Sequence, residues 1–411
     1  MVQPIGVAGE SEAVSSRDAS RYLVIDALRG VAAVSVLAFH LFYSGPQATL
    51  LHDGLPHWLT HGIEYGRSGV AIFFVLSGFV IALTTRRLGS RSRDALRFGA
   101  RRQLRLDPPY WLMLAVVLLL GAMERLVPGL VYQSYSFAEV VENATYTQGF
   151  FGDPSILAVA WTLCLEVQFY LVVLLLVIVA GVLVGRTGAV PTPSLAPRQA
   201  WVRSGAWALG ILSLLYADMG WSAGPWFIGA WWTFCLGATV CWFVKGDIGV
   251  VSLTVALGIA LFAQTISVAQ GFGDEWGGQW FALATAAVLV ILFLVGRLGS
   301  RPWRWLLFLG SISYSLYLVH LPVIDVGMGA LDKVLPQTLV GALVAVVVGA
   351  AAAMTVAVVL HRWVEVPAIR LSRSLTTGSR EEIKARLRAY RWWPTARAAR
   401  AASVGRDTGG T

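Results

Sequence analysis

Two ionisable side chains of the first long apolar segment fall on one face of a helix. Arg29 and His40 are 11 residues apart, almost three helical turns, which separates them by roughly 16 Å along the axis. Asp26 precedes Arg29 by one turn, where it can pair with the guanidinium. Because an ionisable group inside a membrane span costs about 2.5 kcal/mol or more, we expect Arg29 and His40 to be functional. A structural Asp–Arg pair with a capped histidine is the alternative.

Two later apolar segments carry groups suited to the same chemistry. The first of them, residues 156–185, carries Trp161 and Glu166. Glu166 lies about 15 Å from the outer end of this segment, where an unpaired carboxylate would protonate or find a partner. In the other, Ser313, Tyr317 and His320 follow i, i+4, i+7 spacing and form one polar stripe. A histidine, a carboxylate and hydroxyls that meet at one depth indicate proton transfer. A proton relay in a transporter would show the same groups, so both readings stay open here.

A basic stretch lies before the third apolar segment. Arg102 and Arg105 are three residues apart, one helical turn, so both can bind one anion. We expect Arg101, Arg102 and Arg105 to bind a phosphate-bearing ligand. The other arginines of 86–105 are ordinary positive charge on the cytoplasmic side of a membrane protein.

The composition places these residues in a lipid environment. The chain is 56% hydrophobic and 13% charged, whereas soluble proteins carry about 25% charged residues. Long apolar runs recur, and each is long enough to cross a bilayer. The sequence therefore predicts an all-α polytopic membrane protein, a bundle of about ten transmembrane helices. The expected spans are 23–43, 66–85, 108–127, 156–185, 205–220, 225–244, 249–270, 279–296, 305–325 and 337–360.

The distribution of basic residues predicts the orientation. With the N-terminus in the cytoplasm, the outer segments hold only Arg67, Arg125 and Lys333 among the 32 lysines and arginines, so both termini are expected inside. The net charge of +9 then reflects topology and attraction to anionic lipid, and predicts no nucleic-acid partner.

Three regions follow from this orientation. We expect a polar cytoplasmic N-terminus over 1–21, without a cleavable signal peptide, and a membrane domain over 22–370. A basic cytoplasmic tail over 371–411 is expected to contain an amphipathic helix and to end in disorder.

Six short motifs, in this order, resemble the acyltransferase 3 family of membrane acyltransferases. The resemblance runs from about residue 22 to 370. The motifs are Ile25-Asp26-Ala27-Leu28-Arg29-Gly30 with His40; Gly69-Val70 through Phe73 to Phe79; Arg101 to Arg105; Trp161 to Tyr170; Leu309 to Pro322; and Glu365-Val366-Pro367-Ala368-Ile369-Arg370.

The resemblance implies transfer of an acyl group, often acetyl, from a cytoplasmic thioester such as acetyl-CoA to a hydroxyl. Acceptors in the family are commonly cell-envelope glycans, lipids or small secreted products. It also implies that His40 is the central catalytic residue and that Arg29 and the paired arginines serve the donor. Ala71 and Asp107 depart from the family pattern, which leaves the class intact and weakens inference about the substrate. Many members carry an esterase-like extracytoplasmic domain, and none is expected in these residues.

The chemistry of the arginines and of His40 suits acyl transfer. A phosphate-rich donor would dock on the arginines while its thin arm extends between helices. His40 would accept the hydroxyl proton or carry the acyl group, and Glu166 or His320 would orient it or carry the proton. Trp161, Ser313 and Tyr317 are expected to contact substrate.

The expected partners are the lipid bilayer of a bacterial plasma membrane, acyl-CoA and a hydroxyl-bearing acceptor, with no metal. A proton-coupled transporter or exporter of acylated products is the main alternative. A non-catalytic membrane scaffold is less favoured because it leaves the shared face of Arg29 and His40 unexplained. The sequence leaves the acceptor and the oligomeric state open.

Overall fold

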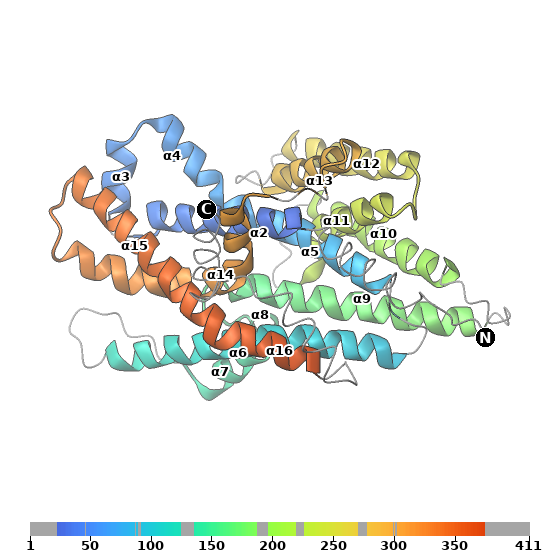
Figure 1. The fold of residues 1–411 in the computed structure, drawn as a ribbon, viewed down its shortest axis with the longest axis horizontal. Helices are drawn as coiled ribbons and strands as arrows, with labels where there is room; N and C mark the ends of the chain where they lie inside the picture. Colours follow the sequence, from blue (N-terminus) through green and yellow to red (C-terminus); the bar gives the residue numbers. More distant parts are fainter. Residues whose placement is uncertain are drawn as a thin grey trace, which may run out of the picture.

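The computed structural model describes residues 23–374, apart from 46, 87, 89–91, 125–134, 187–195, 219–225, 270–277, 299 and 301. Throughout these residues the regular elements are helices (Figure 1). The predicted N-terminal region 1–21 and all of the tail beyond residue 374 lie outside the described residues.

The helices follow the apolar runs of the sequence. In chain order they are α2 (Leu23–Tyr43), α3 (Ala48–Gly54), α4 (His57–Glu64), η1 (Tyr65–Ser68), α5 (Gly69–Thr85), α6 (Ser92–Glu124), α7 (Phe137–Ala144), α8 (Gln148–Phe151), α9 (Ala160–Arg186), α10 (Ala196–Asp218), η2 (Phe227–Gly229), α11 (Trp231–Val244), α12 (Val250–Ala269), α13 (Gly278–Leu294), α14 (Arg304–Asp332), α15 (Leu339–Leu360), η3 (His361–Glu365) and α16 (Val366–Ser374).

Seven stretches of these residues are long and apolar enough to cross a membrane. They are Leu23–Tyr43, His57–Thr85, Ala95–Met123, Ala160–Val184, Val250–Ala269, Arg304–Asp332 and Leu339–Ser372. Two shorter apolar helices are α11 and α13, and α10 is not among the seven in the described part of the chain. The third expected span, 108–127, differs most, because α6 already begins at Ser92 and takes in the basic residues before it.

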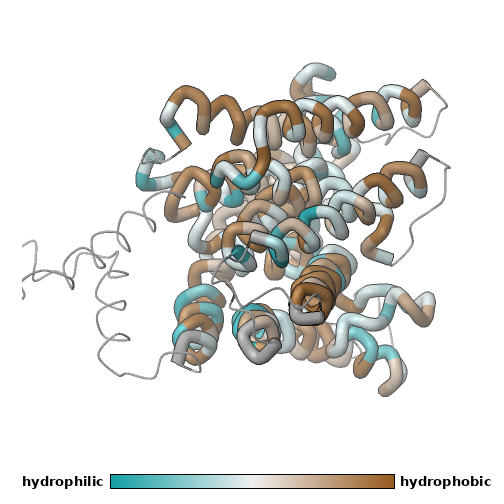
Figure 2. Tube along the Cα trace, turned by 90° about the vertical axis from the view of Figure 1, so that its right-hand side faces the viewer, coloured by the Kyte–Doolittle hydropathy of each residue, from teal (hydrophilic) through white to brown (hydrophobic). Residues whose placement is uncertain are grey.

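Large apolar side chains point outward from several helices. Leu171 of α9, Phe262 of α12 and Val347 of α15 are each more than half exposed. Figure 2 shows hydrophobic residues along the peripheral helices as well as the central ones. Water would not tolerate so much exposed apolar surface, whereas lipid favours it. The chain is therefore a multi-pass membrane protein.

Helices α2 and α14 touch backbone to backbone. A Cβ on Gly30 would lie 2.6 Å from the amide nitrogen of Gly310, and one on Gly310 would overlap the carbonyl oxygen of Asp26. Small residues at a crossing let membrane helices approach this closely. Ten residues beyond each glycine stand His40 and His320, whose ring centroids are 4.9 Å apart. The two helices therefore run parallel, and the glycine contact fixes the register in which the histidines meet.

A second glycine contact joins α5 to α11. A Cβ on Gly78 would overlap the carbonyl oxygen of Phe234, and one on Gly237 would overlap that of Val75. Nearly all of α11 is buried, so this short helix packs inside the bundle and not at its periphery. Its close contact sets the position of α5, which carries Ser77 toward the centre of the molecule.

Residues 135–159, which precede α9 and are called the returning segment below, fold back along α6. The Tyr110 hydroxyl donates to the carbonyl oxygen of Asn143 (2.8 Å), and the Trp111 indole donates to that of Ala144 (3.0 Å). Tyr110 lies about 20 Å before the end of α6 at Glu124. The helices α7 and α8 consequently lie beside α6 (Figure 1), where the sequence predicted only an outer loop.

Tyr146 anchors this returning segment. Its backbone has a φ of 61°, which is unusual for a residue other than glycine, and its ring stacks on Tyr110. Burial, reinforced by the nearby Tyr314 and Asp107, raises the pKa of Tyr146 far above its ordinary value of 10. The phenol therefore stays protonated and donates to the Asp107 carboxylate at 2.9 Å. The departure at Asp107 noted in the sequence is thus an anchor for the returning segment.

Candidate active site

Two histidines from α2 and α14 form the first part of the site. His320 is 1% exposed, and its Nε2 lies 3.2 Å from Nδ1 of the partly buried His40. The two residues are 280 positions apart in the chain, and the glycine contact of their helices brings them together. The two histidines, which the sequence placed at one depth, are therefore in direct contact.

Backbone carbonyls determine which ring nitrogens carry protons. Nδ1 of His40 lies 2.9 Å from the carbonyl oxygen of Val36, and Nδ1 of His320 lies 2.8 Å from that of Tyr317. A carbonyl oxygen only accepts hydrogen bonds, so both Nδ1 atoms must donate. His320 then presents the lone pair of Nε2 to His40 Nδ1, whose single N–H is shared between this lone pair and the Val36 carbonyl oxygen. In this tautomer His40 keeps an unprotonated Nε2 that can accept a proton from a substrate.

Helix α9 joins the histidine pair through Tyr317. The Tyr317 hydroxyl lies 2.8 Å from the hydroxyl of Thr162, and its ring contacts those of His320 and Phe73. Thr162 follows Trp161, which the sequence assigned to substrate. Tyr317 is thus part of the wall between α9 and the histidines. The Ser313 hydroxyl, in contrast, bonds within its own helix, where it donates to the carbonyl oxygen of Gly310.

Glu166 forms a hub with α5 and α6. One of its carboxylate oxygens accepts from the hydroxyls of Ser77 (2.8 Å) and Tyr170 and from the Arg102 guanidinium (3.2 Å). The Arg102 guanidinium also lies over the Tyr170 ring, 4.8 Å from its centroid. This position differs from the expected one, because among the described residues Glu166 contacts neither histidine. Along the axis it lies about 10 Å from His320, counted through Tyr317 and Thr162.

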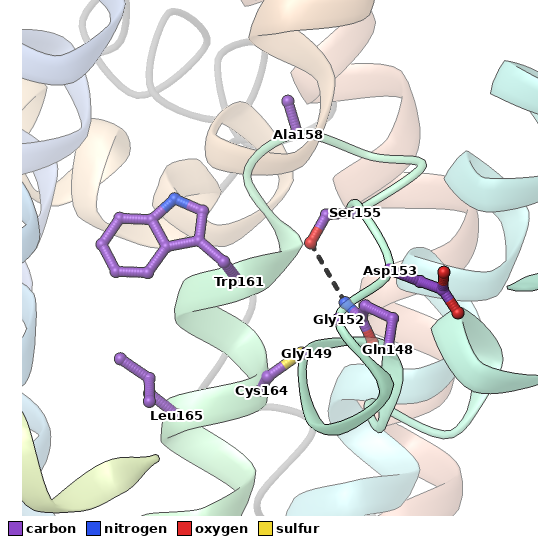
Figure 3. Close-up of a pocket in the computed structure, with 9 residues that line it drawn as sticks. All are labelled: Gln148, Gly149, Gly152, Asp153, Ser155, Ala158, Trp161, Cys164 and Leu165. Atoms are coloured by element: carbon purple, nitrogen blue, oxygen red, sulfur yellow. Dashed lines mark hydrogen bonds between the residues drawn. The ribbon is translucent and has the colours of Figure 1, made fainter. Parts of the chain in front are cut away.

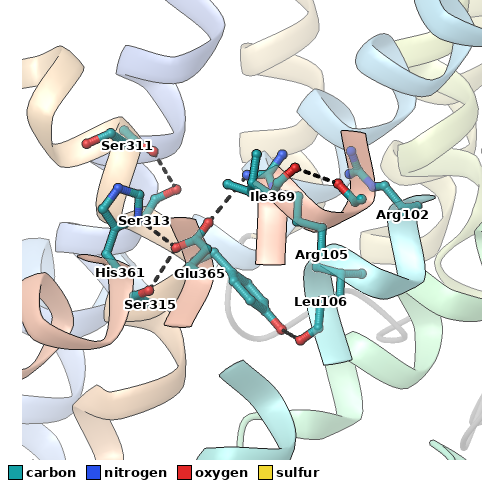
Figure 4. A network of polar contacts seen from close by, with 12 residues as sticks. Arg102, Arg105, Leu106, Ser311, Ser313, Ser315, His361, Glu365 and Ile369 are labelled. Carbon is teal, nitrogen blue, oxygen red and sulfur yellow. Dashed lines mark hydrogen bonds and ion pairs between the residues drawn. The ribbon is translucent and has the colours of Figure 1, made fainter. Parts of the chain in front are cut away.

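Glu365 forms a second hub, which the sequence analysis assigned no role. It is completely buried and accepts from the Ser315 hydroxyl (2.8 Å), His361 Nδ1 (2.9 Å) and, at 3.5 Å, from Arg105 (Figure 4). The helix turns into a π-helix over η3, and such turns are frequent at functional sites. The signal that could have found Glu365 is a carboxylate at the end of a long apolar run, with His361 one turn before it.

Three guanidinium groups gather near these hubs. Arg29 lies within electrostatic range of Arg102 and Arg105 as well as of Asp26 and Glu166. Arg102 and Arg105 each have a carboxylate partner, whereas Arg29 forms no ion pair with any described residue. The expected Asp26–Arg29 pair is therefore absent from the described part of the chain. The Nε atoms of Arg29 and Arg102 are buried without a hydrogen-bond partner.

The paired arginines differ from each other in burial. The Arg102 side chain is only 13% exposed, because α6 begins ten residues earlier and carries it into the bundle. Arg105 is one-third exposed. Arg101 lies apart from both, since its Nε donates to the carbonyl oxygen of Arg97 on the same helix. Of the residues predicted to bind the donor, the structure thus brings Arg29, Arg102 and Arg105 together and leaves Arg101 apart, and anion binding at this cluster stays a prediction.

Chemically, the site has two levels on the face shared by Arg29 and His40. One level holds three guanidinium groups, two of which have a buried Nε without a hydrogen-bond partner among the described residues, and this favours an anion such as a phosphate. The other holds an imidazole base, oriented by a second imidazole.

Comparisons with known proteins agree with this chemistry. A family model described as an acyltransferase domain, that of acyltransferase 3, matches residues 22–362. The peptidoglycan O-acetyltransferase OatA of Listeria monocytogenes is 26% identical, over 76% of this chain and 51% of that protein. The O-acetyltransferase OatA of Staphylococcus aureus is 28% identical over 74% and 51%, and the putative peptidoglycan O-acetyltransferase YrhL of Bacillus subtilis is 28% identical over 73% and 48%.

This chain spans about half the length of these curated relatives. No solved structure matches it significantly. The family model nevertheless covers most of the chain, including both histidines and all three arginines of the site. The chain thus belongs to the acyltransferase 3 family of integral membrane acyltransferases.

Proposed function

We propose that this protein transfers an acetyl group from a cytoplasmic acyl-CoA, acetyl-CoA foremost, to a hydroxyl of a cell-envelope glycan. Membership of the acyltransferase family and the printed names of the relatives support an O-acetyltransferase. The observation that carries the proposal is the free Nε2 of His40, set by two backbone carbonyls and one neighbouring imidazole, on the same helix face as Arg29.

We further propose that the membrane domain, residues 22–370, crosses the plasma membrane ten times with both termini in the cytoplasm. The seven long spans, together with α10, α11 and α13, would make up the ten crossings. The scarcity of lysine and arginine in the segments that would lie outside supports this orientation. The arginines then lie toward the cytoplasm and the histidines in the outer half of the bundle.

The donor phosphates would bind at the arginines. Among the described residues, Arg29 contributes a charge without an ion-pair partner, and Arg102 contributes an unused Nε donor. Glu166 holds the Arg102 guanidinium in place, so we assign it a positioning role in the donor site. The acyl arm of the donor would then extend between α2 and α14 toward His40.

The chemical step would use His40 as a general base. Its Nε2 takes the proton of the acceptor hydroxyl while the oxygen attacks the thioester carbonyl, and His320 accepts from Nδ1–H of the resulting imidazolium. The carbon–sulfur bond breaks, and the leaving thiolate receives the proton from His40. The products are an O-acetyl ester and free coenzyme A, so atoms and charge balance and His40 returns to its starting tautomer.

The test uses purified protein in lipid nanodiscs, acetyl-CoA labelled in the acetyl group, and a glycan acceptor. We expect acceptor-dependent release of free thiol in equal amount to labelled ester. His40→Ala should lower kcat about 10²- to 10⁴-fold, the usual contribution of a positioned base, with an unchanged donor KM. Near-normal turnover in this variant would overturn the role of His40.

Two further outcomes discriminate between the alternatives. A transporter or exporter releases no thiol from acetyl-CoA, so thiol release that depends on the protein argues against it. In the absence of acceptor, label retained on wild-type protein and lost in His40→Ala would show an acyl-histidine carrier in place of the general base.

A further inference from the structure

A cavity of about 480 Å³ lies where the returning segment meets the start of α9 (Figure 3). Its size falls within the range of about 300–1,000 Å³ that is usual for small-molecule sites. Its lining is mixed and comes from α8, the connection to α9 and the first two turns of α9. The lining residues are Gln148, Gly149, Gly152, Asp153, Ser155, Ala158, Trp161, Cys164 and Leu165.

Gln148 gives this cavity a fixed polar group. Its side chain is 1% exposed, and its Nε2 donates to the Ser155 hydroxyl at 3.1 Å. Its Oε1 is buried and has no hydrogen-bond partner among the described residues. An unsatisfied buried acceptor costs about 1–3 kcal/mol, and a ligand that donates an O–H or N–H to it would remove this cost.

The other lining groups select the chemical class of that ligand. Trp161, which is 52% exposed, offers a large aromatic ring with a polar tip at the wall of the cavity. Ser155 adds a hydroxyl, whereas the Asp153 carboxylate points away from Trp161 and Gln148 (Figure 3). A pyranose ring matches this set, because it has an apolar C–H face that packs on an aromatic ring and hydroxyls around its edge that donate to an amide oxygen.

The cavity lies close to the histidine pair. Trp161 lines it, and the next residue, Thr162, is hydrogen-bonded to Tyr317, whose ring contacts His320. One turn of α9 therefore has the cavity on one face and the wall of the histidine site on the adjacent face. A sugar chain bound in the cavity would have its neighbouring units within reach of that wall.

We propose that this cavity is a sugar subsite that binds one pyranose unit of the acceptor glycan, with its ring on Trp161 and a hydroxyl or amide N–H donated to Gln148. The proposal rests on the glycan acceptor of the proposed function. It assigns the acceptor to the returning segment, whereas the donor is held by α2 and α6.

Binding is measured without turnover, so that the subsite and the function can fail separately. The probe is a β-1,4-linked trisaccharide of N-acetylglucosamine, observed by saturation-transfer NMR with the protein in nanodiscs. Maltoside detergent is avoided because its sugar headgroup would compete. Trp161→Ala and Gln148→Leu should each weaken binding about tenfold, in line with the loss of one buried contact. Trp161→Phe, which keeps an aromatic face, should recover most of the affinity.

Trp58→Ala is the matched control, since Trp58 is 75% exposed on α4 and does not line the cavity. In turnover assays Trp161→Ala should raise the acceptor KM and leave the donor KM unchanged. Trisaccharide binding that Trp161→Ala and Gln148→Leu leave unaltered, or no binding to wild type, overturns the subsite even if acetyl transfer is observed. Binding that depends on both residues without any acetyl transfer retains the subsite and overturns the proposed function.

Discussion

The charged residues of the site differ in how many partners hold them, and this decides which substitutions are informative. Arg102 is largely buried against Glu166, so its removal leaves a buried carboxylate unpaired and costs about 3–5 kcal/mol of stability. Loss of activity in that variant would report on folding as well as on binding. Arg29 forms no ion pair with a carboxylate of the described residues and lies near two other cations, so its charge stabilises the fold least among the three arginines.

Arg29→Gln should therefore weaken donor binding without unfolding the protein. A hydrogen bond to a charged group contributes about 1.5–3 kcal/mol, so we expect the donor KM to rise about 10- to 100-fold. Thermal unfolding should stay at the wild-type temperature or rise slightly. The control is Arg101→Gln, because Arg101 bonds to its own helix and should leave both quantities unchanged. An unaltered donor KM in Arg29→Gln would remove Arg29 from the donor site.

His320 is expected to act through His40 and not on the substrate. His320→Leu removes the acceptor that faces His40 Nδ1–H and should lower kcat about 3- to 10-fold, the value of one neutral hydrogen bond. His320→Gln keeps an acceptor oxygen on a side chain of similar length and should restore part of kcat. The KM values of both substrates should hold in both variants. Equal loss in both would indicate a packing role.

Among the elements, the glycine contact of α2 and α14 has the most direct effect on the site. Gly310→Ala would force a methyl group into the carbonyl oxygen of Asp26, and backbone cannot move aside as a flexible side chain can. We expect lower thermal stability and a lower kcat, because the helices must separate where their histidines meet. The control is Gly327→Ala in the same helix, where a methyl group meets nothing within 4 Å. That change should be neutral or stabilise by about 0.5–1 kcal/mol. Wild-type kcat and stability in Gly310→Ala would contradict the argument.

At the level of elements, the sequence predicts what depends on local pattern. The apolar runs locate α2, α9, α14 and α15, and the spacing of Arg29 and His40 places them on one helix face. The fold-back of the segment before α9 was not predicted, because it depends on hydrogen bonds between side chains of α6 and carbonyls 33 residues further on. Hydropathy contains no signal for such contacts.

In the site, too, local pattern predicts some contacts, whereas others depend on packing between helices. His40 and His320 could be paired from depth and residue type, but Glu166 could not be assigned to Arg102 in place of a histidine. That choice depends on the rotation of α9 relative to α6. Neither periodicity nor depth specifies the rotation, which follows from packing against the whole bundle.

For the whole molecule, the orientation in the membrane connects all the proposals. With the cytoplasmic donor that we propose, the arginines would open toward the cytoplasm, and the proposed acceptor in the cell envelope would approach from the other side. The short helices α3 and α4 would then lie at the outer surface, α3 beside the start of α15 and α4 against α2 (Figure 1).

Single cysteines test this orientation in a background without the native Cys164, Cys235 and Cys241. Asp53 and Gly249 are exposed and lie on opposite sides in the proposed topology. A membrane-impermeant thiol reagent applied to intact cells should label Asp53→Cys and not Gly249→Cys. Permeabilised cells serve as the control, because both positions should then react. The reverse pattern in intact cells would invert the topology and separate the arginines from a cytoplasmic donor.

The backbone contact of α2 and α14 also determines how the protein responds to its bilayer. A lipid layer thinner or thicker than the protein prefers acts on helices mainly by changing their tilt. Sliding one helix past the other by a turn would move the two histidine rings about 5.4 Å apart, but the opposed glycines leave no space for the bulkier residues of another register. Hydrophobic mismatch therefore tilts the pair as one body and leaves the distance between the rings unchanged.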